Sequence, residues 1–211
     1  MSKENKFETN AIHVGNSPDP STGSISPPIH LTSTYVQDGI GKNKGFDYSR
    51  GTNPTRERLE KNIASLEGGY DAIAFSSGMA ATTALLQHLK QGDHVIISRN
   101  VYGGTYRMTT QVLSNHGLKF DFVDTTDTQN IKETIKPETK WVFIETPTNP
   151  MLEVTDIAAV SKICKESNIK FAVDNTFMSP FGQRPIEHGA DCVMHSTTKF
   201  IGGHSDVLGG V

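Results

Sequence analysis

The stretch Lys170-Phe171-Ala172-Val173-Asp174-Asn175-Thr176 places an apolar run directly before an acid, an amide and a hydroxyl. Short unbroken apolar runs are typical of strands that are covered on both faces, as in parallel sheets. Five other runs share this pattern, and the six strand candidates are Ala72–Phe75, His94–Ser98, Lys119–Val123, Trp141–Glu145, Lys170–Asp174 and Asp191–Ser196. Helix candidates begin near Gly78, Gly104, Asp127, Thr155 and Pro185. The alternation predicts an α/β fold with a largely parallel sheet.

Residues 1–53 differ from the rest of the chain. Four prolines between positions 18 and 28 stand among serines, threonines and glycines, with little periodicity, which is typical of an irregular segment. A helix is predicted from Asn53-Pro54, an N-cap followed by a first-turn proline, to Gly68-Gly69. We therefore divide the chain into an arm, 1–53, which is expected to pack on something else such as a partner subunit, and a domain, 54–211.

Composition argues against several classes of function. The 211 residues carry a formal net charge of -3, which gives no electrostatic case for binding nucleic acid or an anionic membrane. No apolar run is long enough to span a bilayer, and the polar residues 1–6 lack the apolar core of a signal peptide. Cys164 and Cys192 form no Cys-x-x-Cys pair, which fits reduced thiols and a cytoplasmic location. The eight histidines show no metal-ligand spacing, so no metal site is expected.

The residues that follow each strand are candidates for a site, because ligands of α/β sheets collect beyond the carboxyl ends of the strands. Ser77-Gly78-Met79 could start a helix whose free N–H groups cradle a phosphate, or Ser77 could only cap that helix. Tyr102 stands beside two glycines and could stack on a planar ligand or pack at the sheet edge. Asn149 lies between two prolines, in a stiff turn that could present its amide or bind nothing.

Asp174 and Lys199 follow successive strands. A carboxylate at the end of an apolar strand needs a partner such as a cationic ring nitrogen, although a turn formed by the Asp-Asn pair would also explain it. Lys199 has Ser196 and Thr198 beside it; burial would keep its amine neutral and nucleophilic, whereas a surface lysine is the alternative. A phosphate site, a stacking tyrosine, a buried acid and an amine that traps an aldehyde are together what pyridoxal 5'-phosphate requires.

Motifs along the whole chain resemble those of one family. They are Ala11-Ile12-His13-Val14-Gly15, Pro27-Pro28-Ile29, Tyr48-Ser49-Arg50, Asn53-Pro54-Thr55-Arg56, Leu66-Glu67-Gly68-Gly69, Ser77-Gly78-Met79, Val101-Tyr102-Gly103-Gly104, Glu145-Thr146-Pro147-Thr148-Asn149-Pro150, Val173-Asp174-Asn175-Thr176-Phe177, Ser196-Thr197-Thr198-Lys199 and Gly203-His204-Ser205-Asp206-Val207. On these motifs the chain resembles the Cys/Met-metabolism pyridoxal-phosphate enzymes, the trans-sulfuration enzymes. The resemblance implies a fold-type I, aspartate aminotransferase-like architecture, with helices on both faces of the sheet, and a homotetramer built as a dimer of dimers.

The resemblance also implies roles for single residues. Lys199 would hold the aldehyde of the cofactor and then shuttle protons, and Tyr102 would stack on the ring and help to deprotonate the incoming amine. Asp174 would pair with the pyridine nitrogen, Asn149 would bond the ring hydroxyl, and Thr176 would support the ring from the sheet side. The residues implied to hold the phosphate are Gly78, Met79, Ser196 and Thr198.

Two features depart from the family pattern. Tyr48 and Arg50 of the arm would reach the cofactor phosphate of a neighbouring subunit, yet the loop after Arg50 reads one residue shorter than the pattern usually has. The chain also stops at Val211, whereas family members continue into a C-terminal domain that carries the arginine for the substrate carboxylate. We therefore expect that this domain is absent from the chain.

The activity that the resemblance implies is γ-elimination from an amino-acid substrate, L-cystathionine, which gives cysteine, 2-oxobutanoate and ammonia. Two other reactions of the family remain open: γ-replacement on an O-acyl-L-homoserine with cysteine, and γ-elimination from methionine. A function of another class is open as well, in which a shortened relative keeps the arm and the dimer surface but acts only as a binding or assembly protein.

Overall fold

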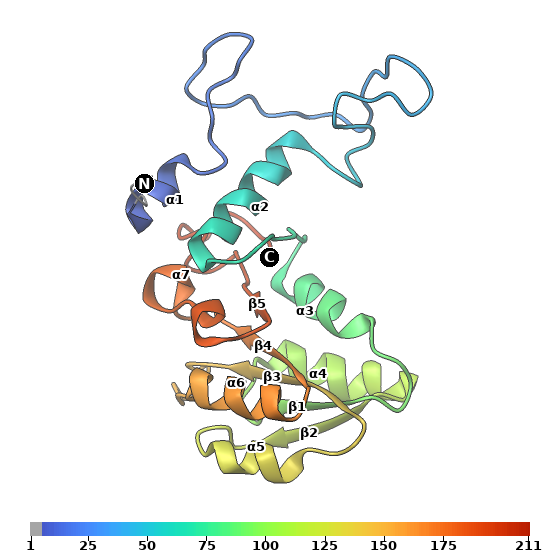
Figure 1. Ribbon diagram of the computed structural model, residues 1–211, viewed down its shortest axis with the longest axis vertical. Helices are drawn as coiled ribbons and strands as arrows, with labels where there is room; N and C mark the ends of the chain where they lie inside the picture. The colour runs from blue at the N-terminus through green and yellow to red at the C-terminus, as the bar shows by residue number, and fades with distance from the viewer. Residues whose placement is uncertain (1–5) are drawn as a thin grey trace. The chain divides into compact units, whose positions relative to one another are not determined.

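A five-stranded parallel sheet is the centre of the fold in the computed structural model, which describes residues 6–211 (Figure 1). The strands are β1 His94–Ser98, β2 Lys119–Val123, β3 Thr139–Glu145, β4 Lys170–Asp174 and β5 Cys192–Met194. Their order is β2-β1-β3-β4-β5, and every neighbouring pair is parallel, so the carboxyl ends of the strands meet at one edge. The predicted α/β class and parallel sheet are confirmed. The first five positions of the polar start lie outside the described residues.

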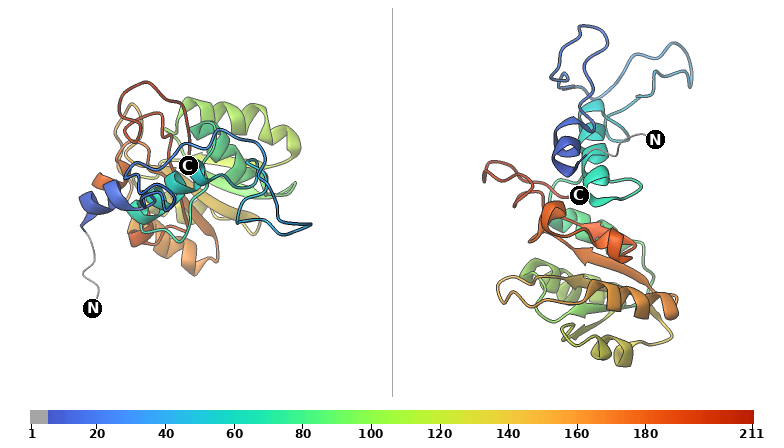
Figure 2. Two further views of the ribbon diagram at one scale, coloured as in Figure 1. Left: turned by 90° about the horizontal axis from the view of Figure 1, so that it is seen from above. Right: turned by 60° about the vertical axis from the view of Figure 1, so that its left-hand side comes forward.

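Helices cover both faces of this sheet (Figure 2). On one face, α3 Gly78–Gln87 and α4 Gly103–Gln111 pack over a cluster that includes Leu86, Ile97 and Phe143. On the other face, α5 Thr128–Thr134 and α6 Ile157–Glu166 pack over a cluster that includes Ile96 and Ile144. Successive residues of β1 and β3 therefore enter opposite clusters, and this is the physical reason why the strands read as unbroken apolar runs.

Two of the predicted strands differ in the structure. The run Ala72–Phe75 is not a strand, because only Phe75 finds a partner: it makes an isolated antiparallel bridge with Gly210, with N···O distances of 2.8 and 3.0 Å. The last strand is shorter than predicted and ends at Met194. Beyond it, His195 exchanges two backbone hydrogen bonds with Val211, at 2.9 and 3.0 Å, instead of extending the ladder with β4.

The remaining short elements also depart from the prediction. The helix expected near Pro185 is a single 3₁₀ turn, η2 Pro185–His188, and a one-turn helix that was not predicted, α7 Ser179–Gly182, precedes it. A further 3₁₀ turn, η1 Leu113–His116, follows α4. Each of these elements is only four residues long, so none carries the repeated apolar spacing that a sequence pattern needs.

The chain divides by its internal contacts into two compact units, one that ends at Ala74 and one of residues 75–211. The first unit contains α2 Pro54–Glu67, which begins and ends as predicted. The Asn53 side chain accepts hydrogen bonds from two backbone N–H groups of the first turn, and Gly68 ends the helix in the left-handed region, with φ at 70°. The assignment of residues 1–53 as an arm that serves a neighbouring subunit stays a prediction.

Most of that arm is irregular, as predicted, but it begins with a helix that the sequence did not indicate, α1 Phe7–His13. None of the residues of α1 is buried, so it lacks the apolar period that marks a packed helix. The side-chain amide of Asn62 in α2 attaches it, donating hydrogen bonds to the carbonyls of Asn10, Ala11 and Val14 at 2.9 to 3.2 Å. Hydrogen bonds from α2, and not the burial of apolar side chains, thus hold α1 in place.

The two-sided burial of the sheet predicts the effect of a core substitution. Ile144 in β3 is fully buried, so we expect Ile144→Ala to lower the free energy of unfolding by about 2 to 5 kcal/mol in denaturant titrations. Lys140→Ala is the matched control, because Lys140 is the exposed residue of the same strand and its replacement is expected to change stability by at most about 0.5 kcal/mol. Equal losses in the two variants would contradict this account of the core.

Candidate active site

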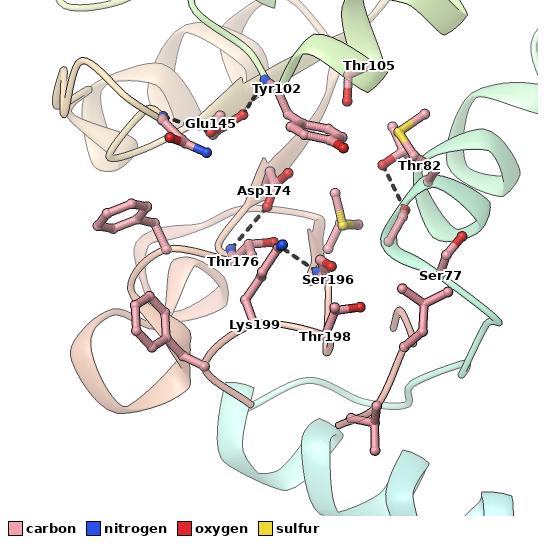
Figure 3. A pocket seen from close by; sticks show the side chains of 18 of the residues that line it. Ser77, Thr82, Tyr102, Thr105, Glu145, Asp174, Thr176, Ser196, Thr198 and Lys199 are labelled. Carbon is pink, nitrogen blue, oxygen red and sulfur yellow. Dashed lines mark hydrogen bonds between the residues drawn. The ribbon is translucent and has the colours of Figure 1, made fainter. Parts of the chain in front are cut away.

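A cavity of about 760 Å³ opens at the carboxyl ends of the strands, within the unit of residues 75–211 (Figure 3). The last residues of β3, β4 and β5 form part of its wall. All nine predicted site residues of this unit line it: Gly78, Met79, Tyr102, Asn149, Asp174, Thr176, Ser196, Thr198 and Lys199. The other two, Tyr48 and Arg50, belong to the first unit, where the Arg50 guanidinium carbon lies 4.8 Å from the centroid of the Tyr48 ring.

The first turn of α3 forms one wall of the cavity. The Ser77 hydroxyl accepts a hydrogen bond from the Ala80 N–H at 3.1 Å, so the interpretation of Ser77 as an N-cap is confirmed. A Cβ atom on Gly78 would lie 2.7 Å from the Cβ of Ser196, which shows how closely the helix start approaches the turn after β5. Ser196 therefore lies beside the N-terminus of α3. Free N–H groups and the helix dipole favour an anion at that position.

The hydroxyl of Thr198 also faces local backbone. It accepts a hydrogen bond from the Gly209 N–H at 3.1 Å and donates one to the Gly209 carbonyl at 3.3 Å. Thr198 thus ties the turn after β5 to the segment that follows it, and the same side chain lines the cavity beside Ser196.

Tyr102 directly precedes α4, lines the cavity and is 48% exposed as a residue. A Cβ atom on Gly104 would lie 2.5 Å from Cε1 of this ring and 2.8 Å from the sulfur of Met79. The glycine therefore makes room for both side chains at the start of α4. The ring packs against the helix start and still presents surface to the cavity.

Asp174 ends β4 and its carboxylate is buried. Burial raises the pKa of Asp174. Hydrogen bonds with Thr176 and the electrostatic effect of the nearby His195 lower it. The backbone N–H of Thr176 donates to Asp174 Oδ1 at 3.0 Å, so the turn that was kept as an alternative explanation of Asp174 is present. The Thr176 hydroxyl accepts from the Ser196 N–H at 2.8 Å. A cation in the cavity would stabilise the charged form of this acid.

Lys199 is exposed, so of the two alternatives that the sequence left open, a buried amine is wrong and the surface position is confirmed. It lies in a turn after β5, where its N–H donates to the Ser196 carbonyl at 3.2 Å and its carbonyl accepts from the Gly203 N–H at 2.7 Å. Because β5 ends at Met194, this turn carries the lysine away from the strand end that would have buried it. Figure 3 shows the side chain extending from the turn into the cavity, toward Asp174 and Thr176. Its amine therefore reaches the cavity from an exposed position.

Glu145 is a site residue that sequence reasoning did not single out. It ends β3 in register with Asp174 of β4, its side chain is buried, and it lines the cavity. Its two carboxylate oxygens accept hydrogen bonds from the backbone N–H groups of Tyr102, at 2.7 Å, and Asn149, at 3.0 Å. Burial, with a further contribution from the charge of Asp174, raises the pKa of Glu145 to about 7. The signal that marked Asp174, an acid ending an apolar run, applies equally here.

Two aromatic residues beside Lys199 were also missed. Phe177 and Phe200 line the cavity, with their ring centroids 6.0 Å apart and their planes at 72°. They are 38% and 64% exposed, so they add apolar surface next to the amine. A single phenylalanine in a loop carries no sequence signal of such a role.

The cavity residues fit an aromatic aldehyde that carries a phosphate. A buried acid suits a cationic ring nitrogen, a reachable amine suits the aldehyde, and the start of α3 suits the phosphate. Within residues 6–211 no group of three or more histidine, cysteine or acidic side chains is arranged to hold a metal ion. In the same part of the chain, no helix has the length and apolar character needed to cross a membrane.

Comparison with known proteins agrees with this interpretation of the cavity. A probable cystathionine gamma-synthase from Herpetosiphon aurantiacus is 52% identical over 97% of this chain and 64% of its own length. A putative cystathionine gamma-lyase 2 from Caenorhabditis elegans is 54% identical over 97% of this chain and 53% of its own length. Relatives at 46 to 50% identity include cystathionine beta-lyases. The crystal structure of metB from Corynebacterium glutamicum superposes with a TM-score of 0.96 at 47% identity, over 98% of this chain and 54% of that one.

The chain thus spans about half to two thirds of the length of these relatives. The family model described as Cys/Met metabolism PLP-dependent enzyme matches residues 8–211, which is nearly the whole chain. With this match, and with relatives about half identical over 97% of its residues, the chain belongs to the family of Cys/Met metabolism enzymes that depend on pyridoxal phosphate.

Proposed function

We propose that the protein is a trans-sulfuration enzyme that catalyses γ-elimination from L-cystathionine, releasing cysteine, 2-oxobutanoate and ammonia. The observation that carries the proposal is the convergence of Lys199, Asp174 and Tyr102 on one cavity that is bounded by the start of α3. When bound, pyridoxal phosphate supplies an electron sink for the charge left on the substrate after a C–H bond breaks. The tasks of the protein are to hold that group and to move protons.

Three contacts would hold the cofactor. The Lys199 amine would bind its aldehyde covalently, and the buried Asp174 carboxylate would keep the ring nitrogen protonated. Burial raises the pKa of Asp174 because water no longer stabilises its charged form. A ring cation beside the carboxylate would stabilise that charged form instead. The free N–H groups of Gly78 and Met79, with the hydroxyls of Ser196 and Thr198, would bind the phosphate.

The remaining residues would orient the ring and the reacting groups. The Tyr102 ring would lie against the cofactor ring, and its oxygen, in the phenolate form, would accept a proton from the incoming ammonium group. Asn149 would bond the ring hydroxyl, and Thr176 would support the ring from the sheet side. Lys199, once displaced by the substrate amine, would take the proton from the α-carbon and return protons in the later steps. Its exposed turn leaves the amine free to swing between these positions.

We further propose that Tyr48 and Arg50 complete the phosphate site of a neighbouring subunit, within a homotetramer in the cytoplasm. This proposal is supported by the packing of the Arg50 guanidinium on the Tyr48 ring, which holds the two side chains together. An arm with few buried apolar residues of its own fits a segment that is ordered by a partner.

The covalent role of Lys199 predicts where the cofactor is attached. Pyridoxal phosphate added to the full-length protein is expected to produce a visible absorption band, and borohydride reduction followed by peptide mass spectrometry is expected to find the adduct on Lys199. Lys199→Ala should lose both signals. Lys170→Ala, which alters an exposed lysine paired with Asp191, is the control and should retain them. An unmodified Lys199 would sink the enzyme proposal and favour a binding or assembly role for the protein.

The close contact between Gly78 and Ser196 predicts a second result. Gly78→Ala would place a Cβ atom 2.7 Å from the Ser196 Cβ and push the helix start away from the turn. We expect affinity for pyridoxal phosphate to fall at least roughly tenfold, or about 1.4 kcal/mol. Gly103→Ala is the matched control, because Gly103 is the first residue of α4 and a Cβ there meets only the end of the Arg107 side chain, at 3.4 Å. Similar losses in both variants, measured by spectroscopic titration, would argue against a phosphate site at α3.

A substrate comparison tests the reaction itself. The full-length protein is expected to release 2-oxobutanoate from L-cystathionine faster than it forms cystathionine from an O-acyl-L-homoserine and cysteine, or 2-oxobutanoate from methionine. The second of these reactions is kept as an alternative because a relative named cystathionine gamma-synthase is 52% identical. Pyruvate release would instead indicate β-elimination. Absence of 2-oxobutanoate from cystathionine would rule out the lyase proposal.

A further inference from the structure

Glu145 connects two loops that leave different strands. Its carboxylate accepts one hydrogen bond from the Tyr102 N–H, in the loop after β1, and one from the Asn149 N–H, in the loop after β3. Its own N–H donates to the Ser98 hydroxyl at 3.2 Å, which anchors the end of β3 to the end of β1. One side chain thus spans the two loops that carry the proposed ring-facing tyrosine and the proposed hydroxyl-binding amide.

A carboxylate is a costly residue at this position. It is 5% exposed and lies opposite Asp174, another buried acid, in the parallel register of β3 and β4. Two like charges at adjacent strand ends destabilise each other, and burial adds to the cost of each. The other side chains on this face of β3 and β4, which include Trp141, Phe143 and Ala172, are apolar and give no partner to an acid. The favourable contribution that Glu145 makes in return is the pair of hydrogen bonds to the two loop amides.

We infer that Glu145 is a positioning residue, whose carboxylate holds the Tyr102 and Asn149 loops at the spacing that directs both side chains into the cavity. A carboxylate suits this task because both of its oxygens are acceptors, whereas a carboxamide offers one acceptor and one donor. The inference rests on the proposed function only in what the two loops are positioned for; the link between the loops stands without it.

The electrostatic environment agrees with this role. Burial and the charge of Asp174 raise the pKa of Glu145 and the two N–H hydrogen bonds lower it, for a net value of about 7. The two hydrogen bonds thus act in favour of the ionised acceptor. The pair of loop amides therefore stabilises the form of Glu145 that can accept both bonds.

Amide hydrogen exchange tests the inference without the cofactor. In the full-length, cofactor-free protein, Glu145→Gln is expected to raise the exchange rates of the Tyr102 and Asn149 amides at least roughly tenfold, while amides in the middle of β1 and β3 keep their protection. Glu138→Gln is the matched control, since Glu138 precedes β3 at its opposite end and pairs with Lys119 on the surface. Unchanged exchange at both loop amides in Glu145→Gln, or equal loosening in Glu138→Gln, would overturn the inference.

A second variant guards against a failure of Glu145→Gln to fold. Glu145→Asp keeps the charge but shortens the reach by one methylene, and it is expected to lose protection at one or both loop amides. Wild-type protection at both amides in this variant would also overturn the inference.

Spectroscopy of the bound cofactor links the loops to the site. The visible circular dichroism of bound pyridoxal phosphate is expected to weaken in Glu145→Gln, with its affinity reduced several-fold, and to remain unchanged in Glu138→Gln. An unaltered signal in Glu145→Gln despite loosened loops would contradict a positioning role toward the cofactor. If the wild-type protein binds no pyridoxal phosphate but the exchange result holds, the link between the loops stands and the proposed function fails.

Discussion

The parallel pairing of β3 with β4 places two carboxylates, Glu145 and Asp174, side by side at the buried end of the sheet. Both acids are only 5% exposed, so each must be stabilised mainly by the groups around it. Glu145 takes its hydrogen bonds from the loops that carry Tyr102 and Asn149, and Asp174 takes one from Thr176. The hydrogen bonds of this pair of acids thus link three of the loops that line the cavity.

Glu145 and Asp174 differ in the groups that stabilise them, and this difference gives the two acids different roles in the proposed chemistry. Both oxygens of Glu145 accept backbone hydrogen bonds, which suits a structural task. Asp174 lines the cavity, and burial raises its pKa, so it would gain stability from a cation brought in by a ligand. Lys199 extends toward the same region from an exposed turn (Figure 3). Its suitability as an aldehyde anchor therefore rests on reach and placement, not on a buried, neutral amine.

Much of this arrangement could be predicted from local signals. The three strands β1, β2 and β4 have the predicted bounds, because each is an apolar run with polar limits, and α2 has them because Asn53 and Gly68 mark its ends. Parallel topology then brings the strand ends together, which is why the residues singled out after separate strands and those added by the family resemblance line a single cavity.

The errors arise where distant parts of the chain decide the outcome. Phe75 forms only a bridge because its partner is Gly210, and β5 ends early where His195 pairs with Val211. The same pairing sets the turn that exposes Lys199. Glu145 also ends an apolar run, as Asp174 does. Its hydrogen bonds, however, come from amides of two separate loops, and no local sequence pattern predicts those partners. Helix α1 was missed because polar contacts from Asn62 attach it.

We propose that the buried Asp174 carboxylate holds a protonated ring nitrogen of the cofactor. The most direct measurement is nitrogen NMR of the full-length protein loaded with pyridoxal phosphate that is labelled with ¹⁵N in its ring. We expect a pyridinium resonance in the wild-type protein at neutral pH and a neutral pyridine resonance in Asp174→Asn. A neutral ring nitrogen in the wild-type protein, or the same resonance in both proteins, would contradict it.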